Sequence, residues 1–465
     1  MTIKDLPAGK SATILKVGGD GALRQHFLDM GLIQGAEVTV IKYAPMGDPV
    51  ELRIHSYELT IRLSDAEQIE VSEPYCIDNK AVENVKMNSI VKEHPGFGEG
   101  GRYHDKENEN PLPDDEKLTF ALVGNQNCGK TTLFNVLTGS NQHIGNFPGV
   151  TVDRKDGVIK GYPDTLITDL PGIYSMSPYS SEEIVTREFL LMDKPKGIIN
   201  ILDATNIERN LYLTTQLIET GVPVVIALNM ADLIEKRGLK IDTKRLSMVL
   251  GCPIIETSAL KGTGLKELIA EAVKVAKQGE HQLPQSIFSE KIEKAIDTVV
   301  PALSETIAAN KKRWYAVKVL ENDEKVMNHI VLSSQNKTTI DSLRKELETE
   351  LDDDMESIIT DGRYTYIQKL ISTTVEKPKE KLTISDKIDK IVTNRFLGIP
   401  IFLLIMYIVY YISVTTVGTF VTDWTNDVFV VAIQDAVSGF LSSVGASGLL
   451  SAVIVDGIIG GLGAV

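Results

Sequence analysis

The chain has 465 residues and a formal net charge of −15, and 43% of its residues are hydrophobic. That length exceeds the usual size of one domain, and the acidic balance argues against binding nucleic acid by neutralising its phosphates. The three cysteines, Cys76, Cys128 and Cys252, are too far apart for a disulfide or zinc pattern and indicate reduced intracellular thiols. The N-terminus (MTIKDLPAGK) has no apolar signal region, so we expect the first domains to lie in the cytoplasm.

Residues 1–73 predict a small β-barrel domain. A short helix is expected at 22–30, and alternating apolar and polar residues predict strands at 37–43, 50–55, 58–63 and 68–71. No catalytic constellation is visible in this part of the sequence. We therefore interpret His26 and His55 as packing or surface residues rather than metal ligands.

Residues 74–116 predict a flexible linker, because their later part is rich in Asn, Glu, Asp and Gly and poor in apolar residues. His94 and His104 lie in this stretch. They could contact a metal ion, but a solvated linker is the interpretation we favour.

Residues 117–280 predict a doubly wound α/β domain, in which apolar runs alternate with helical patterns. The runs that predict strands are 118–123, 158–162, 165–168, 197–202, 224–228 and 254–256. Ligands bind at the carboxyl ends of the strands in such folds. Functional residues are therefore expected directly after these runs.

A complete phosphate-binding loop, GNQNCGKT at 124–131, follows the first of these runs. Backbone N–H groups and the N-terminus of the next helix would face the phosphates. Lys130 would add a positive charge at the terminal phosphates, and the Thr131 hydroxyl could ligate Mg²⁺. A chance glycine loop is the weaker alternative, because the strand and helix that this chemistry needs both flank the motif.

Three further motifs follow predicted strands, and together they predict GTP as the nucleotide. Asp169 in DLPG can hold Mg²⁺ through water, and Gly172 can donate its N–H to the γ-phosphate. Asp232 in NMAD can accept two hydrogen bonds from guanine, a donor pair that adenine lacks. The motif SALK at 258–261 suits a loop that supports the base. An acidic turn at a strand end is the alternative for each motif taken alone.

The loop GNFPGVT, which ends at Thr151, lies between the phosphate loop and DLPG. Thr151 is well placed to close on Mg²⁺ and the γ-phosphate, as in loops that order with GTP; an ordinary turn with a capping residue is the alternative. Ile173 follows DLPG and cannot hydrogen-bond water, so hydrolysis must rely on backbone groups, a monovalent cation or a partner. The side-chain carbonyl of Asn127 could hold K⁺ near the phosphates, or it could only support the hydrogen bonding of the loop.

Residues 281–380 predict an α-helical domain. Within it, Ile292, Ile296, Val299 and Leu303 are spaced at helical intervals and form one apolar stripe. No strand pattern is visible between 286 and 375.

Residues 381–465 predict the start of a polytopic α-helical membrane domain. Residues 396–422 carry no charge, and roughly 20 apolar residues are enough to cross a bilayer. Basic residues between 377 and 395 place the preceding side in the cytoplasm. A second uncharged run at 436–455 gives expected spans of about 396–420 and about 436–458. The sequence stops in an apolar stretch, GIIGGLGAV, which indicates a fragment of a longer protein; Asp456 either lines a pathway or lies at the water interface.

The nucleotide motifs resemble those of a known family. The stretches GNQNCGKTTLFN at 124–135, GNFPGVTV at 145–152, DLPGIYS at 169–175 and NMAD at 229–232 look like the ferrous iron transport protein B family. In that family a cytoplasmic GTPase precedes a polytopic domain that moves Fe²⁺ across the membrane. RWYAVK at 313–318 is similar to the family's helical domain, which is thought to stabilise bound GDP and to pass switch motion to the membrane. A packing module that only spaces the GTPase from the bilayer is the alternative.

The N-terminal domain resembles a second family. MGLIQG at 30–35 and APMGDP at 44–49 are similar to the ferrous iron transport protein A family, an SH3-like fold. That family usually acts as a regulatory partner. The resemblance therefore implies that the fused domain docks on the rest of the chain.

These motifs and the resemblance imply GTP or GDP, Mg²⁺ and K⁺ as ligands. The expected catalytic residues are Lys130, Thr151 and Gly172. Mg²⁺ would be held by Thr131, Thr151 and Asp169, and K⁺ by Asn127. Further nucleotide contacts are expected from Gly124, Asn125, Cys128, Gly129, Thr132, Asn229, Met230, Asp232, Ser258, Ala259 and Leu260. Cys128 stands where many members have Ser, and a redox role for its thiol is the less favoured alternative.

The function we expect is GTP-dependent uptake of ferrous iron by a multi-pass protein of the inner or plasma membrane. A homo-oligomer is compatible with this function, and no nucleic-acid partner is expected. The first alternative is a membrane-tethered regulatory GTPase without transport activity; the second apolar run and the fused domain count against it. A soluble RNA- or ribosome-linked GTPase is disfavoured by the acidic balance and by the uncharged run at 396–422.

Overall fold

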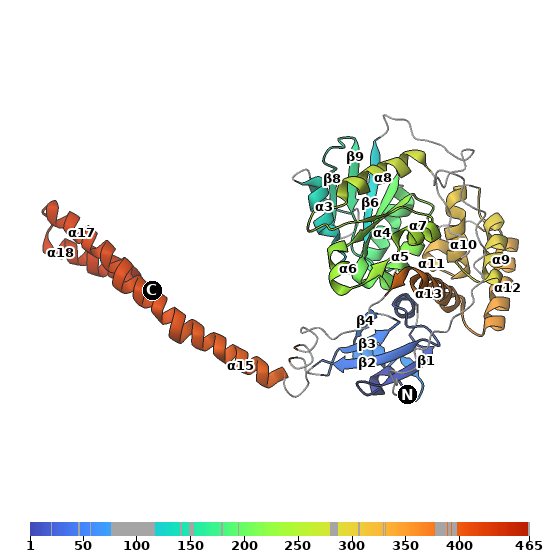
Figure 1. The fold of residues 1–465 in the computed structure, drawn as a ribbon, viewed down its shortest axis with the longest axis horizontal. Coiled ribbons are helices and arrows are strands. Elements are labelled where there is room, and N and C mark those ends of the chain that lie inside the picture. The colour runs from blue at the N-terminus through green and yellow to red at the C-terminus, as the bar shows by residue number, and fades with distance from the viewer. Residues whose placement is uncertain are drawn as a thin grey trace. The chain divides into compact units, whose positions relative to one another are not determined.

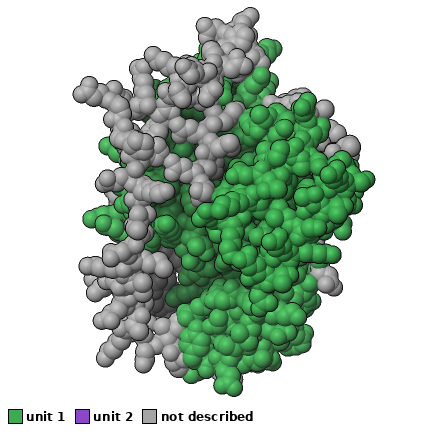
Figure 2. All heavy atoms as spheres, turned by 90° about the vertical axis from the view of Figure 1, so that its right-hand side faces the viewer, with its two compact units in different colours: residues 1–43, 49–380 green, residues 44–48, 381–465 purple. Residues whose placement is uncertain are grey.

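The computed structural model describes two compact units. The described residues are 1–19, 21–44, 47–55, 57–75, 117–139, 142–147, 153–177, 180–193, 195–279, 287–305, 307–328, 330, 332–376, 388, 392 and 398–463. One unit comprises residues 1–43 and 49–380, and the other comprises residues 44–48 and 381–465. In the view of Figure 2 the atoms of the first unit, in green, form one continuous body. The predicted linker at 76–116 lies outside the described residues.

The N-terminal part is a small antiparallel sheet. Its strands are β1 (Ser11–Val17), β2 (Glu37–Tyr43), β3 (Val50–Ile54), β4 (Tyr57–Ile61) and β5 (Ile69–Val71), in the order β4-β3-β2-β1-β5. Alternate residues of β3 and β4 are buried, as expected for a sheet with one face on a core. The helices η1 (Ile3–Asp5), α1 (Ala22–Asp29) and α2 (Leu63–Ala66) accompany the sheet.

Four of these strands and α1 were predicted to within two residues, but β1 and α2 were not. Among the described strands β4 and β5 are the two ends of the sheet order. The predicted barrel is therefore confirmed only as a small β-sheet domain.

The next part is a seven-stranded sheet in the order β13-β11-β10-β6-β9-β8-β7. Its strands are β6 (Leu118–Gly124), β7 (Gln142–Asn146), β8 (Asp153–Val158), β9 (Thr165–Asp169), β10 (Gly197–Asp203), β11 (Val224–Asn229) and β13 (Ile254–Glu256). The pairs from β13 to β9 are parallel, and β8 and β7 add an antiparallel edge. This confirms the predicted α/β domain.

Helices cover both faces of this sheet (Figure 1). They are α3 (Lys130–Thr138), α4 (Ser181–Glu188) with η3 (Phe189–Asp193), η4 (Ala204–Asn206), α5 (Ile207–Glu219), α6 (Ala231–Arg237), α7 (Thr243–Leu250) and α8 (Leu265–Gln278). Phe120 and Leu122 of β6 join one buried cluster, while Ala121 and Val123 join another. Alternation along one strand thus fills the core on each side of the sheet.

The strand predicted at 158–162 was wrong in its position. β8 runs over Asp153–Val158 instead. The N–H of Tyr162 donates to the carbonyl of Ile159, and Gly161 has φ +82°, so the chain turns here before Pro163.

The helical part follows. It consists of α9 (Glu290–Val299), η5 (Val300–Ala302), η6 (Ala309–Lys311), α10 (Lys312–Leu320), α11 (Glu324–Met327), α12 (Ser334–Leu351) and α13 (Met355–Thr374). The predicted apolar stripe of Ile292, Ile296, Val299 and Leu303 is buried. The last strand, β14 (Val375–Glu376), pairs with β12 (Lys240–Ile241), a short ladder that the sequence pattern did not predict.

The second unit contains one helix, Gly398–Ser443, that is long and apolar enough to cross a membrane, within the residues that the structure describes. It runs through α15 (Gly398–Tyr410), η7 (Tyr411–Gly418), α16 (Thr419–Trp424), η8 (Thr425–Val430) and α17 (Val431–Ser443). Its apolar side chains are exposed, with Leu403 at 61% and Phe420 at 70%.

The second predicted span, at about 436–458, is not shown as a separate spanning helix by the described residues. The first helix continues past the aspartates at 423, 427 and 435 and includes the first residues of the uncharged run at 436–455. The chain then turns at Gly445, with φ +75°, and Ser447 caps a new helix by accepting from the N–H of Leu450. That helix comprises α18 (Gly448–Ser451), η9 (Ala452–Ile459) and α19 (Gly460–Gly463). A multi-pass arrangement is not shown by the described residues.

Candidate nucleotide-binding site

The phosphate loop connects β6 to α3 and has the backbone shape that a phosphate cradle needs. Gly129 has φ +90°, and a Cβ there would lie 2.4 Å from Nδ2 of Asn229. Only glycine fits this position. Asn127 also adopts a left-handed conformation, with φ +63°, so the loop turns its backbone twice within three residues.

Lys130 and Asp169 come together from the two sides of the loop. Lys130 is the first residue of α3, and Asp169 is the last residue of β9, the strand next to β6. Lys130 Nζ lies 3.2 Å from Asp169 Oδ1, and the two side chains are 10% and 8% exposed. Burial raises the pKa of Asp169, and the neighbouring Lys130 opposes that rise.

Gly172 lies directly on the phosphate loop. A Cβ at this position would be 3.0 Å from Cγ and 3.1 Å from Cα of Gln126. The N–H of the next residue, Ile173, donates to the carbonyl of Gly124 across 3.2 Å. The DLPG motif therefore packs against the phosphate loop through Gln126. The motif pattern did not indicate this contact.

Asn229 links three motifs. Its Nδ2 donates to the Cys128 carbonyl across 2.8 Å, and its Oδ1 accepts from the N–H of Ala259 across 2.9 Å. The side chain is only 3% exposed. The asparagine thus connects the phosphate loop to the loop after β13.

Asp232 is held from two sides. Its Oδ1 accepts from the Ser258 hydroxyl across 3.0 Å, and its Oδ2 lies 3.3 Å from Lys261 Nζ. These contacts lower the pKa of Asp232, the hydrogen bond from Ser258 most of all. The carboxylate is therefore kept ionised, which is the state that accepts two N–H donors.

Two buried side chains in the loop have different roles in packing. Cys128 is 1% exposed, and burial raises the pKa of its thiol to about 11. A thiol in this state is a poor nucleophile, so the geometry does not support a redox role.

Asn125 is 4% exposed, and both its polar side-chain atoms lack a hydrogen-bond partner among the described residues. An unsatisfied buried amide beside the phosphate loop fits a site built for a polar ligand.

The remaining predicted residues are placed as follows. Thr131 and Thr132 are exposed on the first turn of α3, Met230 has φ +63° at the start of α6, and Leu260 is 85% exposed. Thr151 lies outside the described residues. Apart from Thr151, the predicted site residues lie at the carboxyl ends of β6, β9, β11 and β13 or in the segments that follow them.

Three family models match the chain in sequence order. The model for the FeoA domain matches residues 1–73, the model for ferrous iron transport protein B matches 118–272, and the FeoB cytosolic helical domain matches 288–376. A Porphyromonas gingivalis protein described as an Fe(2+) transport protein A/Fe(2+) transporter FeoB fusion is 37% identical over all of this chain. The chain belongs to the FeoB family. It carries a FeoA domain fused ahead of its GTPase domain, as the motifs predicted.

Solved structures extend the match to the fold. A GDP-bound point mutant of the S. thermophilus FeoB G-domain is 44% identical, with a TM-score of 0.54, over 56% of this chain and all of that one. The S. thermophilus protein bound to GDP.AlF4- and K+ matches with 44% identity and a TM-score of 0.51, over 55% of this chain and all of that one. The phosphate loop, DLPG and NMAD are thus set in a FeoB-type fold, and the G domain is a GTPase domain.

The chain spans about half the length of the curated relatives it matches. It covers 57% of the Porphyromonas gingivalis protein and 52% of a Staphylococcus aureus Fe(2+) transporter FeoB that is 37% identical over 74% of this chain.

Proposed function

We propose that this FeoB protein takes up ferrous iron across the cell membrane and that GTP bound by its G domain gates transport. The observation that carries the proposal is the convergence of Lys130, Asp169 and Gly172 on one loop in a chain whose relatives are named Fe(2+) transporters. The apolar helix Gly398–Ser443 supports a membrane location, with the domains before it in the cytoplasm, where GTP is available.

The role proposed for each residue around the nucleotide follows from the hydrogen-bond donor, acceptor or metal ligand that its side chain or backbone offers. Lys130 and the N–H of Gly172 bind the γ-phosphate, and Asp232 binds the guanine edge. Mg²⁺ suits Thr131 and Asp169, which supply hydroxyl and carboxylate oxygens at the two sides of the loop, with Thr151 as the third expected ligand. Bound Mg²⁺ would neutralise charge at the phosphates, while Lys130 and the N–H of Gly172 would orient the γ-phosphate.

A monovalent cation completes the site. Ile173 offers no hydrogen bond to water, so the DLPG segment contributes only backbone groups. The left-handed turn at Asn127 lets this side chain approach the phosphates, where its carbonyl holds K⁺. A relative that was crystallised with K+ supports this assignment.

The experiment is ferrous iron uptake into cells that lack their own ferrous transporter. The cells would express the full-length gene with or without Asp232→Asn, and membrane fractions would be checked for equal amounts of protein. We expect uptake by the parent protein and a loss of uptake in the variant, together with a loss of GTP binding.

Uptake no greater than in empty cells, with GTP binding intact, would overturn the transport proposal. That result would favour a membrane-tethered regulatory GTPase instead. Recovery of the protein in the soluble fraction would contradict both functions.

A further inference from the structure

The fused domain contacts the segment that follows the DLPG motif through one buried carboxylate. Asp29 ends α1 and is 4% exposed. Its Oδ2 accepts from the Ser175 hydroxyl across 2.7 Å, and its Oδ1 accepts from the Tyr212 hydroxyl of α5 across 2.8 Å. Ser175 is 1% exposed and lies three residues after Gly172. The carboxylate therefore joins the N-terminal domain to the part of the G domain that packs on the phosphate loop.

A second contact reaches the same segment by a different route. The guanidinium carbon of Arg209 lies 4.1 Å from the ring centre of Tyr174 and 5.6 Å from the ring centre of Tyr57 in β4. Tyr57 in turn donates to the Met30 carbonyl across 2.7 Å. Arg209 thus lies between an aromatic residue of the fused domain and one of the segment 173–175.

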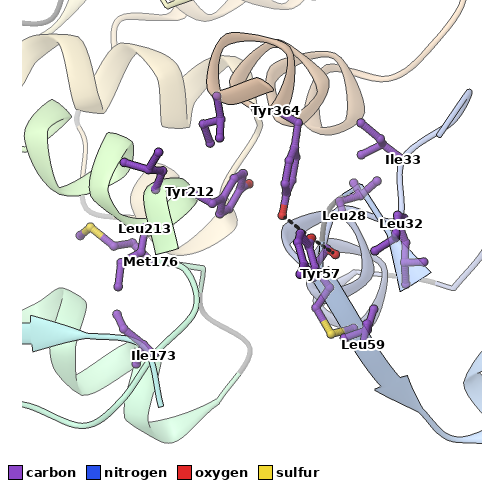
Figure 3. Packing of buried hydrophobic residues seen from close by; sticks show 14 of the residues in the cluster. Leu28, Leu32, Ile33, Tyr57, Leu59, Ile173, Met176, Tyr212, Leu213 and Tyr364 are labelled. Carbon is purple, nitrogen blue, oxygen red and sulfur yellow. Dashed lines mark hydrogen bonds between the residues drawn. The ribbon is translucent and has the colours of Figure 1, made fainter. Parts of the chain in front are cut away.

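The fused domain is anchored on helix α13 beside these contacts. Tyr364 of α13 stacks on Tyr212 with ring centres 4.9 Å apart and donates to the Asp29 carbonyl across 2.8 Å. Figure 3 shows Tyr364 reaching from α13 toward Tyr57, with Tyr212 beside it. Arg24 of α1 donates from both terminal nitrogens to Asp354 at the start of α13. The tyrosines of this anchor are buried and the Arg24–Asp354 pair is partly exposed, so α13 holds the end of α1 that carries Asp29.

The segment 173–175 is held in one particular place, closed on the phosphate loop. The N–H of Ile173 is bonded to the Gly124 carbonyl, Gly172 touches Gln126, and Lys130 pairs directly with Asp169. A γ-phosphate with its Mg²⁺ must enter between Lys130 and Asp169 and must engage the N–H of Gly172. A diphosphate also draws Lys130 toward its β-phosphate, but it makes no contact with the N–H of Gly172, so only the triphosphate requires the DLPG segment to shift.

We propose that the fused domain is a clamp on the segment 173–175, with Asp29 as its positioning residue, so that docking and γ-phosphate binding oppose each other. The inference rests on the proposed nucleotide roles of this site. Coupling between two sites is reciprocal: a bound triphosphate weakens docking by the factor by which docking weakens triphosphate binding. The clamp therefore selects the diphosphate state, and loosening it favours GTP.

The test is the ratio of affinities for a non-hydrolysable GTP analogue and for GDP. Both are measured by displacing a fluorescent GDP from the full chain in lipid nanodiscs. Asp29→Asn and Ser175→Ala each remove part of the clamp with little change in shape. We expect each to raise the affinity for the analogue about five- to tenfold and to leave the affinity for GDP within about twofold. The double variant should bind the analogue about as tightly as either single variant, because both substitutions break the same Asp29–Ser175 interaction.

Asp5→Asn is the matched control, because Asp5 is an exposed acid of the same domain that accepts from Thr2. It should leave the ratio unchanged. An unchanged ratio in Asp29→Asn and Ser175→Ala, a fall in affinity for the analogue, or additive effects in the double variant would overturn the clamp. Failure of the parent protein to bind either nucleotide would instead contradict the proposed function itself.

Discussion

Arg363 of α13 donates to Glu219 of α5 across 2.7 Å, and the two side chains are 1% and 0% exposed. The same guanidinium donates to Glu321, across 3.1 Å, from its other terminal nitrogen. This buried arrangement ties the helical domain to the G domain. Removing one partner would leave a buried charge without compensation, which is far more costly than losing an exposed ion pair.

The first prediction concerns this pair. Arg363→Ala should lower the free energy of local opening of α13 by about 3–5 kcal/mol, as measured by native-state hydrogen exchange of the α13 amides. Arg53→Ala is the control, because Arg53 pairs with Glu58 at 3.2 Å while both side chains are about half exposed. It should change stability by less than about 1 kcal/mol. Equal effects of the two substitutions would contradict the structure.

The second prediction concerns pH and Glu356, at the start of α13. Burial, with Glu321 and Asp354 nearby, raises the pKa of Glu356 to about 7. The folded state therefore binds a proton that the unfolded state releases near pH 4.5, so stability falls as the pH rises from about 4.5 to about 7. Glu356→Gln should raise the thermal midpoint relative to the parent protein at pH 8 but not at pH 4.5. A difference that is largest in acid would contradict this assignment.

A third prediction tests base recognition. Asp232→Asn replaces one acceptor oxygen with a donor and removes the charge, so it should weaken GDP binding about 10- to 100-fold. Because xanthine carries a carbonyl where guanine carries its amine, the variant should gain affinity for the xanthine nucleotide. Displacement of a fluorescent nucleotide from the full chain measures both. Weaker binding of both nucleotides to the same extent would indicate damage to the fold rather than a change of recognition.

The fourth prediction concerns the shape of the phosphate loop. Gly129→Ala places a methyl group 2.4 Å from Asn229 Nδ2 at a left-handed position, so nucleotide binding should be lost. Gly161→Ala is a control with nearly the same conformation, φ +82°, but with no atom within 4 Å of the added group. It should keep its nucleotide affinity. Retained binding in Gly129→Ala would show that the loop can open.

A fifth prediction separates the two interpretations of Asn127. Asn127→Gly removes the side-chain carbonyl and suits the left-handed backbone, so the loop should keep its fold. If the carbonyl holds K⁺, GTP hydrolysis by the variant should no longer be faster in KCl than in NaCl, while GDP affinity stays near that of the parent. If the side chain only supports the loop, K⁺ stimulation should survive.

Local pattern predicted much of this fold. The strands β6, β9, β10 and β11 are apolar runs that are mostly buried, whereas the short edge strand β13 is half-buried. Each of the five predictions lies within one or two residues of the observed strand. β7 and β8 at the edge (QHIGN and DRKDGV) have no such run, so periodicity could not find them. The phosphate loop and its partner motifs were predictable because each follows a strand end.

The contacts of Asp29 were not predictable from local sequence. Asp29 and Ser175 are separated by 146 residues, and although Ser175 ends the stretch DLPGIYS, that motif gives no sign of a partner in the N-terminal domain. A lone buried carboxylate at a helix end has no periodicity and no spacing signal. Only the packing of the fused domain on α5 and α13 brings Ser175 and Tyr212 to the Asp29 carboxylate and Tyr364 to the Asp29 backbone carbonyl.

The covalent joining of the FeoA domain to the GTPase changes how such an interface responds to the cell. A separate regulatory subunit would bind or dissociate according to its abundance. A tethered domain encounters its docking surface on the same chain at an effective concentration of about millimolar, whatever the level of expression. Synthesis and degradation then cannot adjust occupancy of the interface formed by Asp29, Tyr57 and Tyr364. Regulation is left to ligands that change the affinity of the two surfaces within one molecule.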